Sequence, residues 1–279
     1  MTNSPPHPVP TDRGRADPPP HPPPTDRGRA GPHWRRAFAR RPWAFEVLLF
    51  LLALLVYQAS RAILIGDDAR AFANAAEIIR WERTSGLYVE LNIQQFILTH
   101  LNLTKALNYF YVYAHWVVTA LFFVWLYRRR PAAYPYVRNG FFAANAIALA
   151  VFIAYPVAPP RLLGGAFVDT LGRISDIDLH AGRLSSLFNP YAAVPSMHFG
   201  YALMVAAVAV VLVRSWTLRL GVMVYPVVVF IAITGTANHY VLDSVAGSVV
   251  VAAGFVVVAV WMRVRSRGRP AHATMPSGP

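Results

Sequence analysis

The sequence contains, from Ser244 to Met262, the uncharged stretch SVAGSVVVAAGFVVVAVWM, and several arginines follow it directly. A helix of about 20 predominantly apolar residues is long enough to cross the hydrocarbon core of a bilayer. Other apolar runs approach this length, at 44–65, 106–126, 137–155, 197–213 and 219–237. The predicted fold is therefore an all-α membrane protein, a bundle of six transmembrane helices.

The composition of the 279-residue chain agrees with a membrane protein and narrows the chemistry open to it. Hydrophobic residues make up 56% of the sequence, and cysteine is absent. Without cysteine the chain has no disulfide, thiolate zinc site or cysteine nucleophile. The net charge of +13 would suit a nucleic-acid-binding protein, but most basic residues flank the apolar runs, where they orient a membrane protein. No nucleic-acid partner is expected.

Segments of different composition divide the chain. Residues 43–262 hold the apolar runs and are predicted to form the membrane domain. Residues 1–42 are rich in proline and arginine and bury too little apolar surface to fold, so they are predicted to be a disordered cytoplasmic tail. Residues 263–279 are predicted to be a second disordered tail, basic and also cytoplasmic. Within the membrane domain, the charged stretch 67–104 is predicted to form short extracytoplasmic helices at the membrane interface.

The distribution of basic residues predicts the orientation of the chain. Six spans place both termini on one side, and most of the 26 lysines and arginines belong to that side. Basic loops are retained in the cytoplasm, so the termini are expected there, in a multi-pass protein of the plasma membrane. The segments 67–104, 156–195 and 238–243 then face outward, and they hold the polar motifs from which a site could be built.

The first motif is YPVAPPR, residues 155–161, which follows the third apolar run. Its prolines end the helix and stiffen the exit from the membrane. Arg161 is then expected near the interface, where its planar guanidinium could bind a phosphate through two hydrogen bonds. An arginine that extends to lipid headgroups is an equally good interpretation of this motif alone.

The second motif is PSMH, residues 195–198, at the start of the fourth apolar run. Serine is a favoured N-cap residue, so Ser196 is predicted to begin a helix and His198 to lie in its first turn. Unpaired backbone N–H groups and the helix dipole favour an anion at such a position. Taken alone, the motif is equally typical of an ordinary capped helix.

The third motif is NHYVLD, residues 238–243, between the fifth and sixth apolar runs. If His239 and Asp243 share a helical turn, their spacing of four residues puts them on one face. The carboxylate could then keep one imidazole nitrogen protonated and leave the other as a nucleophile or base. The alternative is a structural His–Asp pair at a helix end.

Topology is expected to bring these motifs together. Two spans separate His198 from His239, so both histidines should reach the same membrane face, and Arg161 should reach it as well. Convergence of two histidines, a carboxylate and an arginine at one depth is much rarer by chance than any single motif. The combination therefore predicts a site, although no motif alone does.

The order Pro-Pro-Arg, Pro-Ser-x-His and His-x-x-x-Asp on a six-span chain resembles the type 2 phosphatidic acid phosphatase superfamily. The fuller strings YPVAPP and NHYVLD look most like its inositol phosphorylceramide synthase branch. The likeness covers approximately residues 45–262.

The resemblance implies a role for each motif residue. His239 would attack phosphorus and form a phosphohistidine, and Asp243 would orient it. His198 would protonate the leaving oxygen and later deprotonate the acceptor. Arg161 and the N–H groups after Ser196 would bind the phosphoryl oxygens and stabilise their charge. This scheme requires no cofactor and no metal.

Two departures from the superfamily pattern bear on the reaction. Ala154 stands where the phosphatases usually have a lysine, and Ala232-Ile233 stands where they have Ser-Arg. Two cationic phosphate contacts are thus missing, which favours the synthase branch, since that branch is similar in lacking them. Candidates to replace the charge, each of which also suits a solvated loop, are Arg173, His180 and Arg183.

Three functions remain open from the sequence. The favoured one is a phosphotransferase acting on a membrane lipid phosphate, which could move a headgroup such as inositol phosphate or use an alcohol acceptor such as inositol. The second is a phosphatase for lipids of the phosphatidic acid or polyprenyl phosphate type. The third, a carrier of anions or protons, is disfavoured because the polar residues gather at one membrane face. The oligomeric state is not predicted.

One further histidine lies within the second apolar run. His115 and its neighbour Trp116 are interpreted as a hydrogen-bonded pair in the core, with a contact between His115 and the site as the alternative.

Overall fold

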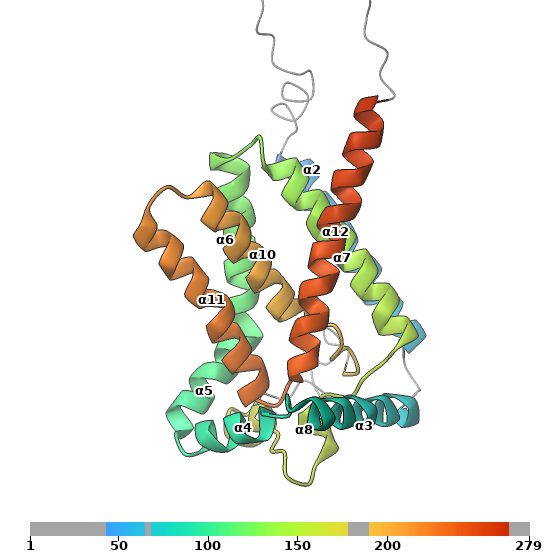
Figure 1. The fold of residues 1–279 in the computed structure, drawn as a ribbon, viewed down its shortest axis with the longest axis vertical. Coiled ribbons are helices and arrows are strands. Elements are labelled where there is room, and N and C mark those ends of the chain that lie inside the picture. The colour runs from blue at the N-terminus through green and yellow to red at the C-terminus, as the bar shows by residue number, and fades with distance from the viewer. Residues whose placement is uncertain (1–42, 65–67, 178–189, 268–279) are drawn as a thin grey trace, which may run out of the picture.

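The computed structural model of the protein describes residues 43–64, 68–177 and 190–267, and these residues are mostly helical, with no strand among them (Figure 1). Each predicted apolar run corresponds to a helical stretch, with ends that differ by a few residues. A helix satisfies its backbone hydrogen bonds internally and can therefore be placed in lipid. The predicted N-terminal tail, 1–42, and the end of the chain, 268–279, lie outside the described residues.

The apolar helices form an elongated bundle. They are α2 (Trp43–Leu64), the continuous stretch of α5 (Leu101–Tyr109), η1 (Phe110–Ala114) and α6 (His115–Arg129), then α7 (Tyr134–Ala154), α10 (Met197–Leu212), α11 (Trp216–Gly235) and α12 (Val241–Arg267). Four of them are long and apolar enough to cross a membrane: 101–129, α7, α11 and α12. The apolar part of α2 and α10 are shorter. Such helices are those of a membrane protein.

The last helix is longer than the sequence predicted. Its apolar run ends at Met262, but α12 continues to Arg267, into the segment assigned to the C-terminal tail. Arginine is a good helix former, and basic side chains interact favourably with the negative end of the helix dipole, so the helix continues beyond the apolar run.

Two helices lie across one end of the bundle (Figure 1). They are α3 (Asp68–Ser85) and α4 (Glu90–Leu98), and they come from the segment predicted to form short helices. The buried face of α3 packs in one cluster with residues of the motif loops: Ala71, Ala75 and Ile78 with Val157, Ala158, Ala193 and Tyr240. The loops that carry the three motifs are thus enclosed between α3 and the bundle.

Close backbone contacts at glycines fix α12 against its neighbours. A Cβ on Gly247 would lie 2.2 Å from the carbonyl oxygen of Ser196, and a Cβ on Gly254 would lie 2.6 Å from the backbone nitrogen of Ala144. Helices in lipid associate through such packing of small residues rather than through the hydrophobic effect. The contact at Gly247 sets α12 directly against the start of α10, and it thereby brings the second and third motifs together.

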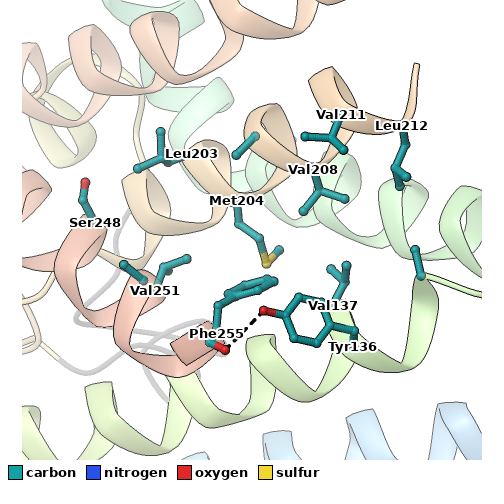
Figure 2. A pocket seen from close by; sticks show the side chains of 13 residues that line it. Tyr136, Val137, Leu203, Met204, Val208, Val211, Leu212, Ser248, Val251 and Phe255 are labelled. Atoms are coloured by element: carbon teal, nitrogen blue, oxygen red, sulfur yellow. Dashed lines mark hydrogen bonds between the residues drawn. The ribbon is translucent and has the colours of Figure 1, made fainter. Parts of the chain in front are cut away.

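An apolar cavity of about 460 Å³ lies between α7, α10 and α12 (Figure 2). Its lining includes Met204, Val251 and Phe255, and the hydroxyl of Tyr136 beside it donates to the carbonyl oxygen of Phe255 at 3.3 Å. It extends along the start of α7 and the end of α10, away from the motif loops. Its lining residues include no charged side chain and no histidine, so the cavity does not resemble a site for phosphate chemistry.

Candidate active site

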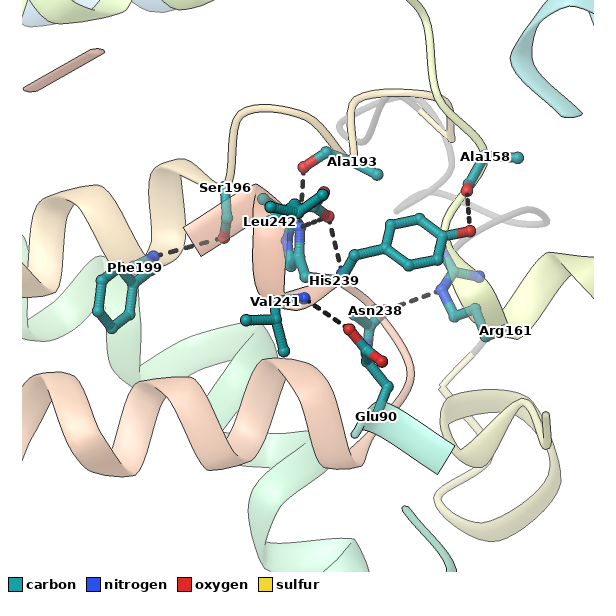
Figure 3. A network of polar contacts seen from close by, with 12 residues as sticks. Glu90, Ala158, Arg161, Ala193, Ser196, Phe199, Asn238, His239, Val241 and Leu242 are labelled. Atoms are coloured by element: carbon teal, nitrogen blue, oxygen red, sulfur yellow. Dashed lines mark hydrogen bonds and ion pairs between the residues drawn. The ribbon is translucent and has the colours of Figure 1, made fainter. Parts of the chain in front are cut away.

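His239 lies in the loop between α11 and α12 and is almost completely buried (Figure 3). Its Nδ1 is 2.9 Å from the carbonyl oxygen of Ala193 and 3.2 Å from Oδ2 of Asp243. A carbonyl oxygen can only accept a hydrogen bond, so Nδ1 carries the proton and the lone pair of a neutral ring lies on Nε2. Burial lowers the pKa of His239 to about 4, with the bond to Ala193 opposing and the charge of Arg161 adding to the shift. The imidazole is therefore neutral at pH 7 and has a nucleophilic nitrogen.

Asp243 reaches His239 by a different route from the one predicted. The sequence argument for their pairing depended on a shared helical turn, but α12 begins at Val241 and His239 precedes it. Asp243 is the third residue of the helix, and its Oδ2 accepts from the backbone N–H of Tyr240 at 2.9 Å as well as from His239. This is the return bond of a capping box, in which the third residue of a helix caps the residue before the helix. The carboxylate thus holds both the helix start and the imidazole.

Two buried glutamates that the sequence analysis did not identify accept hydrogen bonds from the next backbone N–H groups of α12. Oε1 of Glu90 accepts from the backbone N–H of Val241 at 2.7 Å, and Oε1 of Glu82 accepts from that of Leu242 at 2.8 Å. Neither glutamate is exposed. Burial and a hydrogen bond with Glu90 raise the pKa of Glu82 to about 9, so Glu82 is protonated at neutral pH and can share its proton with Glu90. The N–H groups of Tyr240, Val241 and Leu242 at the start of α12 therefore all donate to carboxyl oxygens.

Ser196 is the N-cap of α10, as predicted, and its Oγ accepts from the backbone N–H of Phe199 at 3.5 Å. Its own N–H donates to the carbonyl oxygen of Asp243 at 2.9 Å, which ties the start of α10 to α12. In the described part of the chain, the N–H groups of Met197 and His198 have no acceptor. The start of α10 can therefore still receive an anion.

His198 and His239 face each other, with their ring centroids 5.5 Å apart. His198 lies in the first turn of α10, and His239 is presented by the loop before α12. The two imidazoles are thus close enough to act on the same phosphoryl group. This juxtaposition is the one that the sequence predicted from topology.

Arg161 lies in the short helix α8 (Pro160–Leu163) and is buried within the protein. Its Nε donates to Oδ1 of Asn238 at 2.7 Å, and its backbone N–H donates to the carbonyl oxygen of Ala237 at 2.8 Å. Asn238 is held in turn by Thr236, whose Oγ1 accepts from its Nδ2 at 2.7 Å. Arg161 is therefore fixed to the loop that carries His239. Asn238, the residue before His239, makes this connection, and the sequence analysis gave it no role.

None of the residues proposed to replace the missing cationic contacts is seen at the site in the described part of the chain. Arg173 lies in α9 (Thr170–Ile174) and is exposed, while His180 and Arg183 lie outside the described residues. Ile233, at the position of the usual arginine, is buried in the hydrophobic core with Ala202. A side chain of the size and charge of arginine has no place in that cluster.

Comparison with known proteins assigns the family. The model of the PAP2 superfamily matches residues 76–257, which is more than half of the chain. The region includes all three motifs and the glutamates that cap α12. The protein belongs to the PAP2 superfamily, whose members are generally phosphatases, and membership suggests phosphatase or phosphotransferase activity on phosphate esters. No curated protein and no solved structure matches the chain.

Proposed function

We propose that the protein is a membrane phosphotransferase that acts on lipid phosphate esters through a phosphohistidine at His239. The observation that carries this proposal is the hydrogen bond from Nδ1 of His239 to the carbonyl oxygen of Ala193. This bond leaves the lone pair of the neutral ring on Nε2. The ring centroid of a second histidine, His198, lies 5.5 Å from that of His239.

In the first step, Nε2 of His239 attacks phosphorus, and the bond from phosphorus to the leaving oxygen breaks. His198 donates a proton to that oxygen, which leaves as an alcohol. Asp243 and the Ala193 carbonyl hold the proton on Nδ1 and stabilise the positive charge that the ring acquires. In the second step, the acceptor oxygen attacks phosphorus, His198 takes its proton, and the bond between nitrogen and phosphorus breaks.

The charge that builds on the phosphoryl oxygens requires donors that are already in place. Arg161 and the N–H groups of Met197 and His198 are the proposed donors, and the positive end of the α10 dipole adds to them. These groups belong to this chain and need no cofactor.

Transfer is preferred over hydrolysis because Ala154 and Ile233 stand where the phosphatases have cations. A pocket with fewer fixed charges suits a phosphodiester, which carries one negative charge, better than a phosphomonoester, which carries up to two. The proposed substrate is therefore a phospholipid with a phosphodiester headgroup such as inositol phosphate. The proposed reaction, like that of inositol phosphorylceramide synthases, transfers this headgroup to or from an alcohol.

The proposed topology has six spans, with α2 and α10 crossing the membrane beside the four helices that are long and apolar enough to do so. The basic residues at both ends support cytoplasmic termini. With that orientation, α3 and α4 lie at the outer interface, and the site faces outward from the plasma membrane.

The test is turnover of a labelled phospholipid by the protein in detergent, with and without inositol. Transfer gives a labelled phosphodiester that contains the added inositol, hydrolysis gives the free phosphorylated headgroup or phosphate, and a carrier gives no new product. His239→Ala and His198→Ala should abolish turnover, and wild-type protein should form an acid-labile, base-stable labelled adduct that His239→Ala lacks. His100→Ala, at an exposed histidine, is the matched control and should be normal. Full turnover in folded His239→Ala would remove the assignment.

A further inference from the structure

The imidazole of His198 lies between two other rings, both from the second apolar stretch. Its centroid is 4.4 Å from that of Tyr111, with the planes 25° apart, and 4.4 Å from that of His115, with the planes 40° apart. Tyr201 stacks on His115 in turn, at 5.2 Å and 7°. Tyr111 and His115 are both buried. His198 is therefore one ring in a continuous aromatic stack.

The backbone beneath this stack is a turn of π-helix. η1 spans Phe110–Ala114, between α5 and α6, so it includes Tyr111 and ends directly before His115. A π-turn changes which residues face a neighbouring helix, and such turns are frequent at functional sites. Here the turn lies where Tyr111 and His115, four residues apart, both contact His198.

In the described part of the chain, ring contacts and no hydrogen bond orient the His198 ring. Its Nε2 is buried without a hydrogen-bond partner there, and no other side-chain hydrogen bond of His198 is formed within these residues. A catalytic imidazole is usually oriented by a hydrogen bond to one of its nitrogens, as His239 is by Ala193. His198 instead depends on the two rings that enclose it.

A simple core role accounts poorly for His115. Its Nδ1 is buried without a partner in the described residues, which is unfavourable in a protein interior and more so at membrane depth. Trp116, the partner expected from the sequence, is about half exposed and contacts the His115 ring edge-on. The contacts of His115 thus point toward His198 and the site.

We propose that Tyr111 and His115 are positioning residues that clamp the His198 imidazole and direct it at the phosphoryl group on His239. This proposal rests on the proposed function, in which His198 gives a proton to the leaving oxygen and takes one from the acceptor. Tyr111 also lies edge-on to His239, at 6.3 Å, so one ring sets the relative orientation of both histidines. The face of Tyr111 additionally stabilises His198 when it carries a positive charge.

The experiment compares two esters in full-length variants. One substrate has a lipid alcohol as leaving group, which needs a proton, and the other has p-nitrophenol, which leaves without one. The first-turnover release of each leaving group is measured in Tyr111→Leu and His115→Leu. Loss of correct proton transfer should slow release of the lipid alcohol roughly tenfold to hundredfold, and release of nitrophenolate much less.

Conservative variants separate the clamp from general damage. Tyr111→Phe and His115→Phe keep the stacked rings and should retain most activity on both esters. Trp116→Leu, next to His115 but half exposed, is the matched control and should be normal. If a leucine variant fails to fold, His115→Gln, which removes the ring but keeps a polar side chain of similar size, gives the same comparison.

Two results would overturn the clamp: equal slowing of both esters in folded variants, or no slowing of either. In each case the proposed function stands as long as the wild-type protein turns over and His239→Ala does not. A wild-type protein that releases no leaving group from either ester would instead contradict the proposed function itself.

Discussion

The starts of α10 and α12 lie side by side at the same end of the bundle, but their first-turn N–H groups have different partners. In α12, the amides of Tyr240, Val241 and Leu242 all bond to carboxyl oxygens. In α10, the side-chain partner is a neutral hydroxyl, that of Ser196. Both helix starts carry the positive end of a dipole. The N–H groups at the α12 start are occupied by carboxyl oxygens and this start serves to hold His239, whereas the α10 start keeps N–H groups open to an incoming anion.

The largest effect is expected when the start of α10 is made to resemble that of α12. Ser196→Asp keeps a good N-cap, so the helix should form normally. Its carboxylate would, however, occupy the proposed phosphate position and repel the substrate. We expect kcat/KM on a lipid phosphate ester to fall by about 100-fold or more, which steady-state kinetics would measure.

The matched control for Ser196→Asp is Ser215→Asp. Ser215 is the exposed N-cap of α11, and its Oγ also accepts from the N–H three residues on. The control should fold and turn over normally, because it adds the same charge to a similar cap away from the site. An unchanged kcat/KM in Ser196→Asp would show that the anion does not bind at α10.

The next effect is expected from separating the two helix starts. A Cβ at position 247 would lie 2.2 Å from the Ser196 carbonyl oxygen, which belongs to the backbone and cannot rotate away. Gly247→Ala should therefore destabilise the protein by about 1–3 kcal/mol and reduce turnover as His198 moves from His239. The unfolding midpoint in detergent measures the first effect. Gly221→Ala in α11, where a Cβ meets nothing within 4 Å, should leave both stability and turnover intact.

The same comparison shows which parts of the site the sequence could predict. Ser196 was predicted as an N-cap because capping depends on residues a few positions apart. The pairing of His239 with Asp243 was also predicted, but through a helical turn that His239 does not join, since the helix begins later. Glu82 and Glu90 were missed because they lie in α3 and α4, about 150 residues from the amides that they cap.

Local pattern likewise predicted the fold better than it predicted the contacts. Apolar runs define helices because their length and lack of charge are properties of single segments. The Ala193 carbonyl that fixes the tautomer of His239 has no side-chain signature at all. The contacts of Tyr111 and His115 with His198 depend on a π-turn, and the sequence of that turn, FYVYA at 110–114, contains no pattern that predicts it.

The smallest effect is expected in the pH dependence of stability, which should include a contribution from Glu82 at the start of α12 and none from the start of α10. Glu82 has a folded pKa of about 9 against an ordinary value of 4.5, so between these values the folded protein holds a proton that the unfolded chain has lost. Its stabilising contribution is complete below pH 4.5 and is lost as the pH rises toward 9. The unfolding midpoint of the wild type should therefore fall between pH 7 and 9.5. The midpoint of Glu82→Gln, which keeps the acceptor for Leu242 without titrating, should fall less.

The control is Glu77→Gln, at a more exposed carboxylate of α3, whose midpoint should change with pH as that of the wild type does. Identical slopes in Glu82→Gln and wild type would mean that Glu82 is ionised, and the acid pair would then not share a proton.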